Sequence, residues 1–382
     1  MDDNLVVATM PGDADWPDAT AIDALLAEAG LTREPHIDVF AVAYLDRRLV
    51  GCLGLDGGVV KCAAIAESIQ GFNVLGRLFS ELRCQALLAG HVNLRCYTKP
   101  SYRRRFEALG FTAIAEVPKY AVLLEDDPSG ITDYAAGLAT TFRPGKRIGG
   151  VVMNANPFTY GHRYLLEAAT AYCDVVHVFV VGEDVSRFSY AQRFRMVSEG
   201  VQDMPQRDQL VVHPGSPYVV SRSTFPQYFL HDSADVTRAY TGIDLQIFRR
   251  HIATALGIRH RFLGTEPTSQ ITAEYNRGMG YWLREAPEAA PPISVHEIQR
   301  VGDPPISASR VRRALDAGRW DEIAELVPPT TAALLWEEFT PPVHPTKMLS
   351  PVGSFAGVPG KQDSPLSATY QPSGLAGANR LR

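Results

Sequence analysis

The stretch VVMNANPFTYGHRYL, residues Val151–Leu165, decides the fold of this 382-residue chain. It begins within the apolar run Ile148–Met153, which has the pattern of a buried strand, and it ends inside a helical pattern at 161–172. Farther along, strand patterns alternate with helical ones, which predicts a parallel sheet covered by helices on both faces. Such sheets bind ligands at the carboxyl ends of their strands, so we expect the functional site at this turn.

The turn between this strand and helix has the features of a phosphate site. The unpaired backbone N–H groups and the positive dipole end of the new helix attract an anion, and Gly161 lets the backbone approach it closely. Thr159 offers a hydroxyl, and His162 can donate from its ring to the same phosphate or to a departing pyrophosphate. Taken alone, the same residues also fit an ordinary helix capped by Thr159, with His162 on its surface.

A second motif, ISASRVR at Ile306–Arg312, lies near the end of the same α/β pattern. Ser307 or Ser309 would cap a new helix, whose N-terminus offers amides, hydroxyls and the Arg312 guanidinium to a phosphate. A plain serine cap with a basic helix face also explains this motif when it is taken by itself. The two motifs occur together, however, and the pair resembles the signature of the nucleotidylyltransferase superfamily, whose members bind a triphosphate between them.

Within that superfamily the chain is most similar to the [citrate lyase] ligases, also called acetate:citrate-lyase ligases. The resemblance rests on Val151–Leu165 and on three further stretches, EDVSRFSYAQR at Glu183–Arg193, FLGTEPTSQITAEYN at Phe262–Asn276 and YTKP at Tyr97–Pro100. It spans about residues 39–327.

The resemblance implies a two-step reaction that uses ATP. Acetate attacks the α-phosphorus of ATP to give acetyl-adenylate and pyrophosphate. The thiol of the citrate lyase acyl-carrier subunit, on its CoA-like arm, then takes the acetyl group. Mg²⁺ is expected with the triphosphate. It would be held mainly by the phosphates, because the sequence contains no cluster of carboxylates that indicates a dedicated metal site. Neither nucleic acid nor a membrane is expected as a partner.

The same resemblance implies the site residues. We assign catalysis to His162, Thr159 and Arg312, with the first two at the α-phosphate. We expect acetate beside Asn154 and Asn156, because they flank the first motif. The implied ATP-binding set comprises Asn156, Phe158, Thr159, Gly161, His162, Arg193, Gly264, Glu266, Ile306, Ser307, Ser309 and Arg312.

The predicted fold class is α/β, with two domains. Residues 1–125 are expected to form an α+β domain that resembles the GNAT-fold N-acetyltransferases, and 126–147 a linker. Residues 148–340 are expected to form a Rossmann-like nucleotidylyltransferase domain. The tail at 341–382 is predicted to be disordered, because Pro, Gly and Ser fill 17 of its 42 positions.

The first domain departs from an active acetyltransferase at one motif. GNAT enzymes hold the pyrophosphate of acetyl-CoA with Gln/Arg-x-x-Gly-x-Gly/Ala, and the matching stretch here is QGFNVL at Gln70–Leu75. Asn73 and Leu75 occupy the positions where this motif has Gly and Gly or Ala. Their larger side chains would block the approach of the backbone to a pyrophosphate. We therefore predict that this domain is not an active acetyltransferase. Docking of the carrier protein or of its arm is the alternative role.

Bulk properties fit a cytoplasmic enzyme. The net charge of −5 weighs against nucleic acid as the main partner. Five cysteines, with no Cys-x-x-Cys pair, argue against a disulfide framework or a zinc site. No secretory signal and no apolar stretch of membrane-spanning length are expected.

Two other interpretations of the function stay open: an adenylyltransferase acting on a phosphopantetheine-like substrate, and a non-catalytic carrier-docking protein.

Overall fold

The computed structural model describes residues 4–12, 19–69, 73–127, 129–182, 186–219, 225–230, 232–265 and 270–339. The predicted tail at 341–382 lies outside the described residues. In the part of the chain that the structure describes, no helix is both long enough and apolar enough to cross a membrane.

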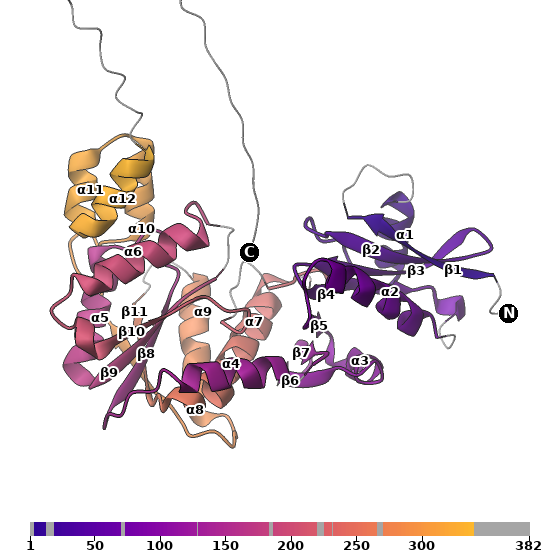
Figure 1. Cartoon of the computed structure of the whole chain (residues 1–382), viewed down its shortest axis with the longest axis horizontal. Coiled ribbons are helices and arrows are strands. Elements are labelled where there is room, and N and C mark those ends of the chain that lie inside the picture. The colour runs from indigo at the N-terminus through magenta and orange to yellow at the C-terminus, as the bar shows by residue number, and fades with distance from the viewer. Residues whose placement is uncertain are drawn as a thin grey trace, which may run out of the picture. The chain divides into compact units, whose positions relative to one another are not determined.

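The first sheet has seven strands, in the order β1-β2-β3-β4-β5-β7-β6 (Figure 1). They are β1 (Leu5–Pro11), β2 (Val39–Leu45), β3 (Arg48–Asp56), β4 (Val59–Ile65), β5 (Arg95–Thr98), β6 (Thr112–Val117) and β7 (Ala121–Glu125), with helices α1 (Ala19–Glu28), α2 (Val74–Leu88) and α3 (Arg103–Glu107). Neighbouring strands are antiparallel, except that β4 pairs in parallel with β5 through Val59↔Arg95 and Val60↔Cys96. Helix α1 packs with Val42 on one face and α2 packs with Ala43 on the other. This mixed sheet with helices on both faces confirms the predicted α+β class of the first part of the chain.

The two edge strands of this sheet, β1 and β6, were not predicted. Each has a single neighbour, β1 pairing with β2 and β6 with β7. The sequences LVVATMP and TAIAEV contain strand-forming Val, Ile and Thr, but neither shows a regular alternation of apolar and polar residues. Their pairing depends on partners elsewhere in the chain, which a local pattern does not show.

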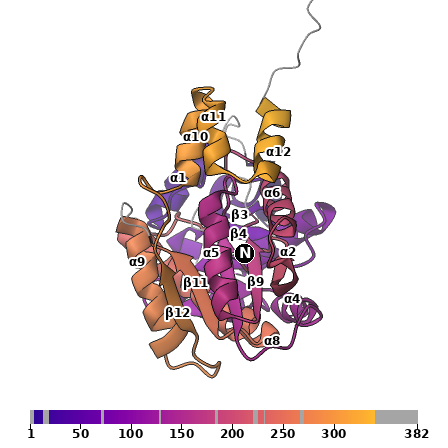
Figure 2. The ribbon, with the colours of Figure 1, turned by 90° about the vertical axis from the view of Figure 1, so that its left-hand side faces the viewer.

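The second sheet is parallel throughout, in the order β10-β9-β8-β11-β12. Its strands are β8 (Ile148–Met153), β9 (Val175–Val180), β10 (Leu210–His213), β11 (His260–Gly264) and β12 (Ser294–Ile298). The helices are α4 (Ser129–Ala139), α5 (Tyr160–Tyr172), α6 (Tyr190–Gln202), α7 (Ser233–Ile247), α8 (Ala253–Leu256), α9 (Gln270–Met279), α10 (Ala308–Asp316), α11 (Trp320–Leu326) and α12 (Pro329–Phe339). Figure 2 looks onto α5, which lies over β8, β9 and β11.

Successive side chains of β9 enter two different cores. Val178 is fully buried in a core with Leu166 of α5 and Val197 of α6. Phe179 is fully buried on the opposite face, in a core with Ile243 of α7. Burial on both faces explains the unbroken apolar pattern of this strand and confirms the predicted Rossmann-like sheet.

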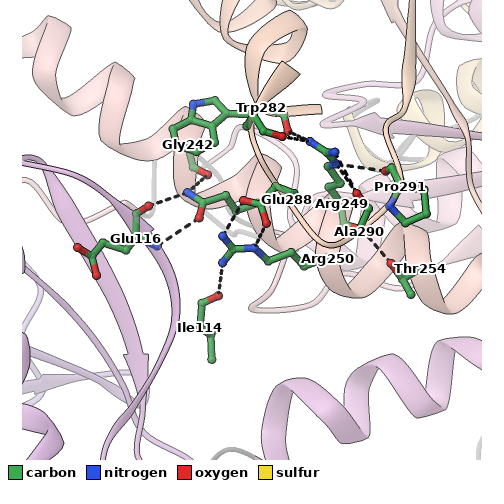
Figure 3. A network of polar contacts seen from close by, with 12 residues as sticks. Ile114, Glu116, Gly242, Arg249, Arg250, Thr254, Trp282, Glu288, Ala290 and Pro291 are labelled. Atoms are coloured by element: carbon green, nitrogen blue, oxygen red, sulfur yellow. Dashed lines mark hydrogen bonds and ion pairs between the residues drawn. The ribbon is translucent and has the colours of Figure 1, made fainter. Parts of the chain in front are cut away.

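The helical periodicity of residues 236–256 predicts one continuous helix, but the structure interrupts it, so that prediction is wrong. A π-helical turn, Phe248–Ile252, separates α7 from α8. Arg249 in this turn is only 3% exposed, and its guanidinium donates to a set of backbone carbonyls (Figure 3). The acceptors are the carbonyl oxygens of Trp282, Ala286, Ala290 and Pro291. Such turns typically occur where one residue is fitted into a helix for a specific contact.

Strand β6 of the first sheet makes polar contacts with α7 and the π-helical turn (Figure 3). The amide Nε2 of Gln246 donates to the carbonyl of Glu116 at 2.9 Å, and its Oε1 accepts from the N–H of Glu116 at 3.4 Å. Arg250 donates to the carbonyl of Ile114 at 3.3 Å and forms a two-point ion pair with Glu288 at 2.6 Å. These bonds satisfy backbone groups along an otherwise open edge strand.

Two histidines are buried side by side on neighbouring strands. The Nδ1 atom of His177 on β9 lies 2.8 Å from Nε2 of His213 on β10, and the rings are 0% and 3% exposed. Burial lowers the pKa of His177 to about 3, helped by the charges of His213 and Arg143, and burial lowers the pKa of His213 to about 4. Both rings are therefore neutral at pH 7.

We expect Gly242→Ala to destabilise the contact between α7 and the first sheet. A Cβ at this position would lie 2.3 Å from Cγ2 of Val117 and 3.0 Å from the ring of Trp282. Overpacking of this kind typically costs about 1–3 kcal/mol, to be measured by urea unfolding. The matched control is Gly137→Ala in α4, where no heavy atom lies within 4 Å of the added Cβ. Gly137→Ala should not lower the free energy of unfolding. An equal decrease in both variants would contradict the packing argument.

The buried histidine pair should make stability depend on pH. Because the folded-state pKa values of about 3 and 4 lie below the ordinary histidine value of 6.5, the unfolded chain binds more protons between pH 6.5 and 4. Stability should fall with decreasing pH by about 2 kcal/mol per histidine between pH 6.5 and 5. Urea unfolding across this range measures it. The double variant His177→Leu/His213→Leu should flatten the curve, and an unchanged slope would show that other groups cause it.

Candidate active site

The first motif forms a capped helix start at the carboxyl end of β8. Thr159 is the N-cap of α5, with extended backbone angles of φ −127° and ψ 167°. Its Oγ1 accepts from the backbone N–H of His162 at 3.4 Å, and Nδ1 of His162 accepts from the backbone N–H of Thr159 at 3.1 Å. Thr159 therefore caps the helix as the plain interpretation expected, while both residues also line a cavity.

The cap fixes the protonation state of His162. Its Nδ1 receives the Thr159 N–H and lies 2.9 Å from the Thr159 hydroxyl, so the neutral ring carries its proton on Nε2. Desolvation, and then the charge of Arg300, lower the pKa of His162 to about 4. The ring stacks on the buried Phe158, with centroids 5.7 Å apart. At pH 7 His162 is therefore an uncharged donor held in one orientation.

The second motif begins α10 and reaches the first. Ser307 is the N-cap, and its Oγ accepts from the backbone N–H of Arg310 at 3.3 Å. The guanidinium of Arg312 donates to Ser309 Oγ at 3.1 Å and to the backbone carbonyl of Asn156 at 2.5 Å. Arg312 thus ties the helix start of the second motif to the turn of the first.

Gly161 lies where the two motifs meet. A Cβ at this position would lie 3.1 Å from the carbonyl oxygen of Ile306, closer than an ordinary van der Waals contact. Glycine therefore allows the two protein segments to approach each other without either having to shift.

A cavity of about 500 Å³ lies between the motifs and the carboxyl ends of β8, β11 and β12. Among the described residues, its lining contains Arg300 and Arg312 as cations and no Asp or Glu side chain. The starts of α5 and α10 both border it, so backbone N–H groups and guanidinium groups surround the same space. The cavity therefore has the chemistry of an anion site.

Most predicted site residues line this cavity. Two more lining residues, Gln299 and Arg300, were missed. They directly follow β12, so their position at a strand end was the available signal. The predicted residues on the lining are Asn154, Asn156, Thr159, Gly161, His162, Gly264, Ile306, Ser307, Ser309 and Arg312.

Three predicted ATP-binding residues are not on that lining. Phe158 is fully buried beneath His162. Arg193 is also fully buried, and its guanidinium donates to the carbonyls of Phe188, Asn154 and Val181 and to Asn154 Oδ1. Neither side chain is on the cavity lining in this structure, and a direct contact of either with ATP stays a prediction. Glu266 lies outside the described residues.

The two asparagines beside the first motif are partly engaged. Asn154 Oδ1 accepts from Arg193 at 2.8 Å, and its Nδ2 donates to Ser186 at 3.3 Å. Asn156 Oδ1 accepts from the backbone N–H of Phe188 at 3.3 Å. Within the described residues, no group of three or more His, Cys, Asp or Glu side chains could hold a metal ion.

Comparison with known proteins gives a consistent result along the chain. The family model described as "Citrate lyase ligase C-terminal domain" matches residues 148–335. The [Citrate [pro-3S]-lyase] ligase of Haemophilus influenzae is 45% identical over 313 residues, 81% of this chain and 92% of that protein. The ligases of Escherichia coli and Klebsiella pneumoniae are each 43% identical, over 81% and 85% of this chain and 88% and 94% of their own lengths.

The predicted state of His162 can be checked directly. In ¹⁵N-resolved NMR of the imidazole groups, we expect a neutral ring with its proton on Nε2 at pH 7 and a titration midpoint near pH 4, because burial disfavours the charged form. The signal is assigned by its absence in His162→Asn. A proton on Nδ1, or a midpoint near 6.5, would contradict the hydrogen bond from Thr159.

Proposed function

Because the chain belongs to the citrate lyase ligase family, we propose that it activates citrate lyase by ATP-dependent acetylation of the thiol on the acyl-carrier subunit. The reaction uses acetate and ATP and yields AMP and diphosphate. The observation that carries this proposal is the cavity between the two helix starts, whose described lining has two guanidinium groups, no carboxylate and the donors that a triphosphate needs.

In the first step, an acetate oxygen forms a bond to the α-phosphorus of ATP. The bond from that phosphorus to the bridging oxygen breaks, and pyrophosphate leaves with the electron pair. Negative charge grows on the non-bridging and leaving oxygens, so donors fixed in advance lower the barrier. The Nε2–H of His162, with the Thr159 hydroxyl and the adjacent backbone, supplies such donors at the α-phosphate.

Arg312, Ser307 and Ser309 are assigned to the β- and γ-phosphates. Burial, and then the charges of Arg187 and Arg313, lower the pKa of Arg312. A phosphate placed beside this guanidinium would relieve both effects, because it replaces lost solvation and opposes the neighbouring positive charge. Arg300, which also lines the cavity, joins this set.

Mg²⁺ fits the site as part of the bound nucleotide. The lining residues that the structure describes offer amide, hydroxyl and carbonyl oxygens but no carboxylate, so the phosphate oxygens would be its main ligands. When bound, the ion neutralises the triphosphate and stabilises the departing pyrophosphate. The amides of Asn154 and Asn156 are assigned to acetate, and Gly264, at the end of β11, to the nucleotide.

The partner and the location follow from the same chemistry. The acceptor is the thiol of the carrier subunit on its CoA-like arm, and citrate lyase becomes active when that thiol is acetylated. We place the protein in the cytoplasm, because its five cysteines are all free thiols, as a reducing compartment keeps them.

The decisive test is acetate-dependent exchange of labelled pyrophosphate into ATP, with Mg²⁺ and without the carrier. We expect exchange that requires acetate, and His162→Ala should slow it by about 10²–10³-fold, the effect of removing one donor from an oxyanion site. His91→Ala, on a histidine that follows α2 in the first domain, is the matched control and should keep the full rate.

Two results would count against the proposal. Full exchange in His162→Ala would remove this residue from catalysis. AMP transfer to a phosphopantetheine ester, with no response to acetate, would replace the ligase assignment by an ordinary adenylyltransferase.

A further inference from the structure

A second cavity, of about 740 Å³, lies at the carboxyl ends of β9 and β10. Both sheets contribute to it. Lys61 of β4 and Tyr97 of β5 line it from the first sheet, and Gly182, Gly215 and Ser216 line it from the loops that follow β9 and β10. The residues assigned above to ATP and acetate do not line this cavity, so its ligand is still to be assigned.

The two cavities share one wall. Met153 lines the first cavity and Val181 lines the second, and the N–H of Val181 donates to the carbonyl of Met153 at 3.1 Å. Arg193 joins the same pair of strand ends, because its Nη1 donates to the carbonyls of Asn154 at 3.0 Å and Val181 at 2.8 Å. The first cavity therefore covers β8, β11 and β12, and the second covers the adjoining β9 and β10 of the same sheet edge.

The loops after β9 and β10 are in close contact at this edge. A Cβ on Gly215 would lie 2.4 Å from the Cα of Gly182, so side chains larger than hydrogen are excluded there. The N–H of Gly215 donates to the hydroxyl of Tyr190 at 2.7 Å. Two glycines thus bring the backbones of the loops after β9 and β10 into contact beside the shared wall.

The lining suits a long ligand of mixed polarity. Tyr97, Phe225 and Tyr228 are each less than 10% exposed and give it an aromatic side. Lys61 is also buried, but Glu34 at 3.1 Å and Asp56 at 2.6 Å balance its charge.

Two more cations line the cavity. Arg33 is paired with Asp23 at 3.0 Å, whereas Arg95 donates to the backbone carbonyl of Pro217 at 3.3 Å. Three cations therefore face three carboxylates, and Arg95 is the guanidinium that an anionic end of the ligand would meet. The volume lies within the roughly 300–1,000 Å³ typical of small-ligand sites.

We propose that the second cavity receives the thiol-terminated arm of the carrier subunit and directs its sulfur to the shared wall. This inference rests on the proposed function and assigns the site of its second substrate. A phosphopantetheine-type arm has the matching chemistry, with apolar methylenes, amides and a phosphate at its attached end. The first domain then serves as one side of the acceptor site, and it needs no acetyl-CoA chemistry of its own.

The step at the wall is an acyl transfer. The sulfur forms a bond to the carbonyl carbon of acetyl-adenylate, and the bond from that carbon to the phosphate oxygen breaks. AMP leaves with the electron pair, and the thiol proton passes to water. No oxidant or reductant takes part.

Gln227→Trp tests the assignment by filling the second cavity. The side chain of Gln227 is exposed on the lining, while its backbone N–H donates to Glu34 at 2.7 Å, a bond that the substitution keeps. Gln202→Trp, at the exposed end of α6 and outside both cavities, is the matched control. Each variant is assayed for acetate-dependent pyrophosphate exchange, and for acetyl transfer to the thiol-form carrier subunit and to free pantetheine.

For Gln227→Trp we expect the KM for both thiols to rise at least about tenfold, or about 1.4 kcal/mol of binding. Its exchange rate should stay within about twofold of the wild type, and Gln202→Trp should change neither reaction. Unchanged KM values for both thiols would overturn the arm site while leaving the ligase function intact. A rise for the carrier alone would also overturn it, because it would indicate a contact with the carrier surface. Absence of exchange in the wild type would instead refute the proposed function itself.

Discussion

Arg193 buries its guanidinium where the ends of β8 and β9 and the loop before α6 come together. Removing a cation from water costs several kcal/mol unless other oxygens replace its hydration, and the carbonyls of Asn154, Val181 and Phe188 do so here. The carbonyls of Asn154 and Val181 directly follow the last residues of β8 and β9, and the carbonyl of Phe188 lies in the loop before α6. They are beyond the ends of the strands. One side chain thus sets the spacing of the strand ends, and the first motif can hold His162 in place only because β8 ends at a fixed point.

The sequence predicted the two motifs and their meeting point well, because each motif is local. A strand end, a capping hydroxyl and a glycine are visible within a few residues of one another. The role of Arg193 was not predictable in this way. The family resemblance placed it among the ATP-binding residues, and only the packing of β8 against β9 shows that backbone carbonyls surround it. Arg300 was missed for the opposite reason, since it lies in no motif and reaches the cavity only through the pairing of β11 with β12.

The fold shows the same division between local and distant causes. The Asp46-Arg47 turn between β2 and β3 was expected as a hairpin, and both residues have positive φ values, of 49° and 65°. The break between α7 and α8 was not expected, because the helical periodicity continues through it. Arg249 and the carbonyls that it contacts are 33 to 42 positions apart, so the cause lies in the tertiary contact.

The shared wall between the two cavities has a consequence for how substrates compete. If each cavity holds its own substrate, filling one leaves the other open, so nucleotide and thiol can be bound at the same time. Analogues of ATP would then leave the apparent affinity for the thiol nearly unchanged, and thiol analogues would behave likewise toward ATP. The reactive mixed anhydride would form with its acceptor already seated, and water would have little time to destroy it.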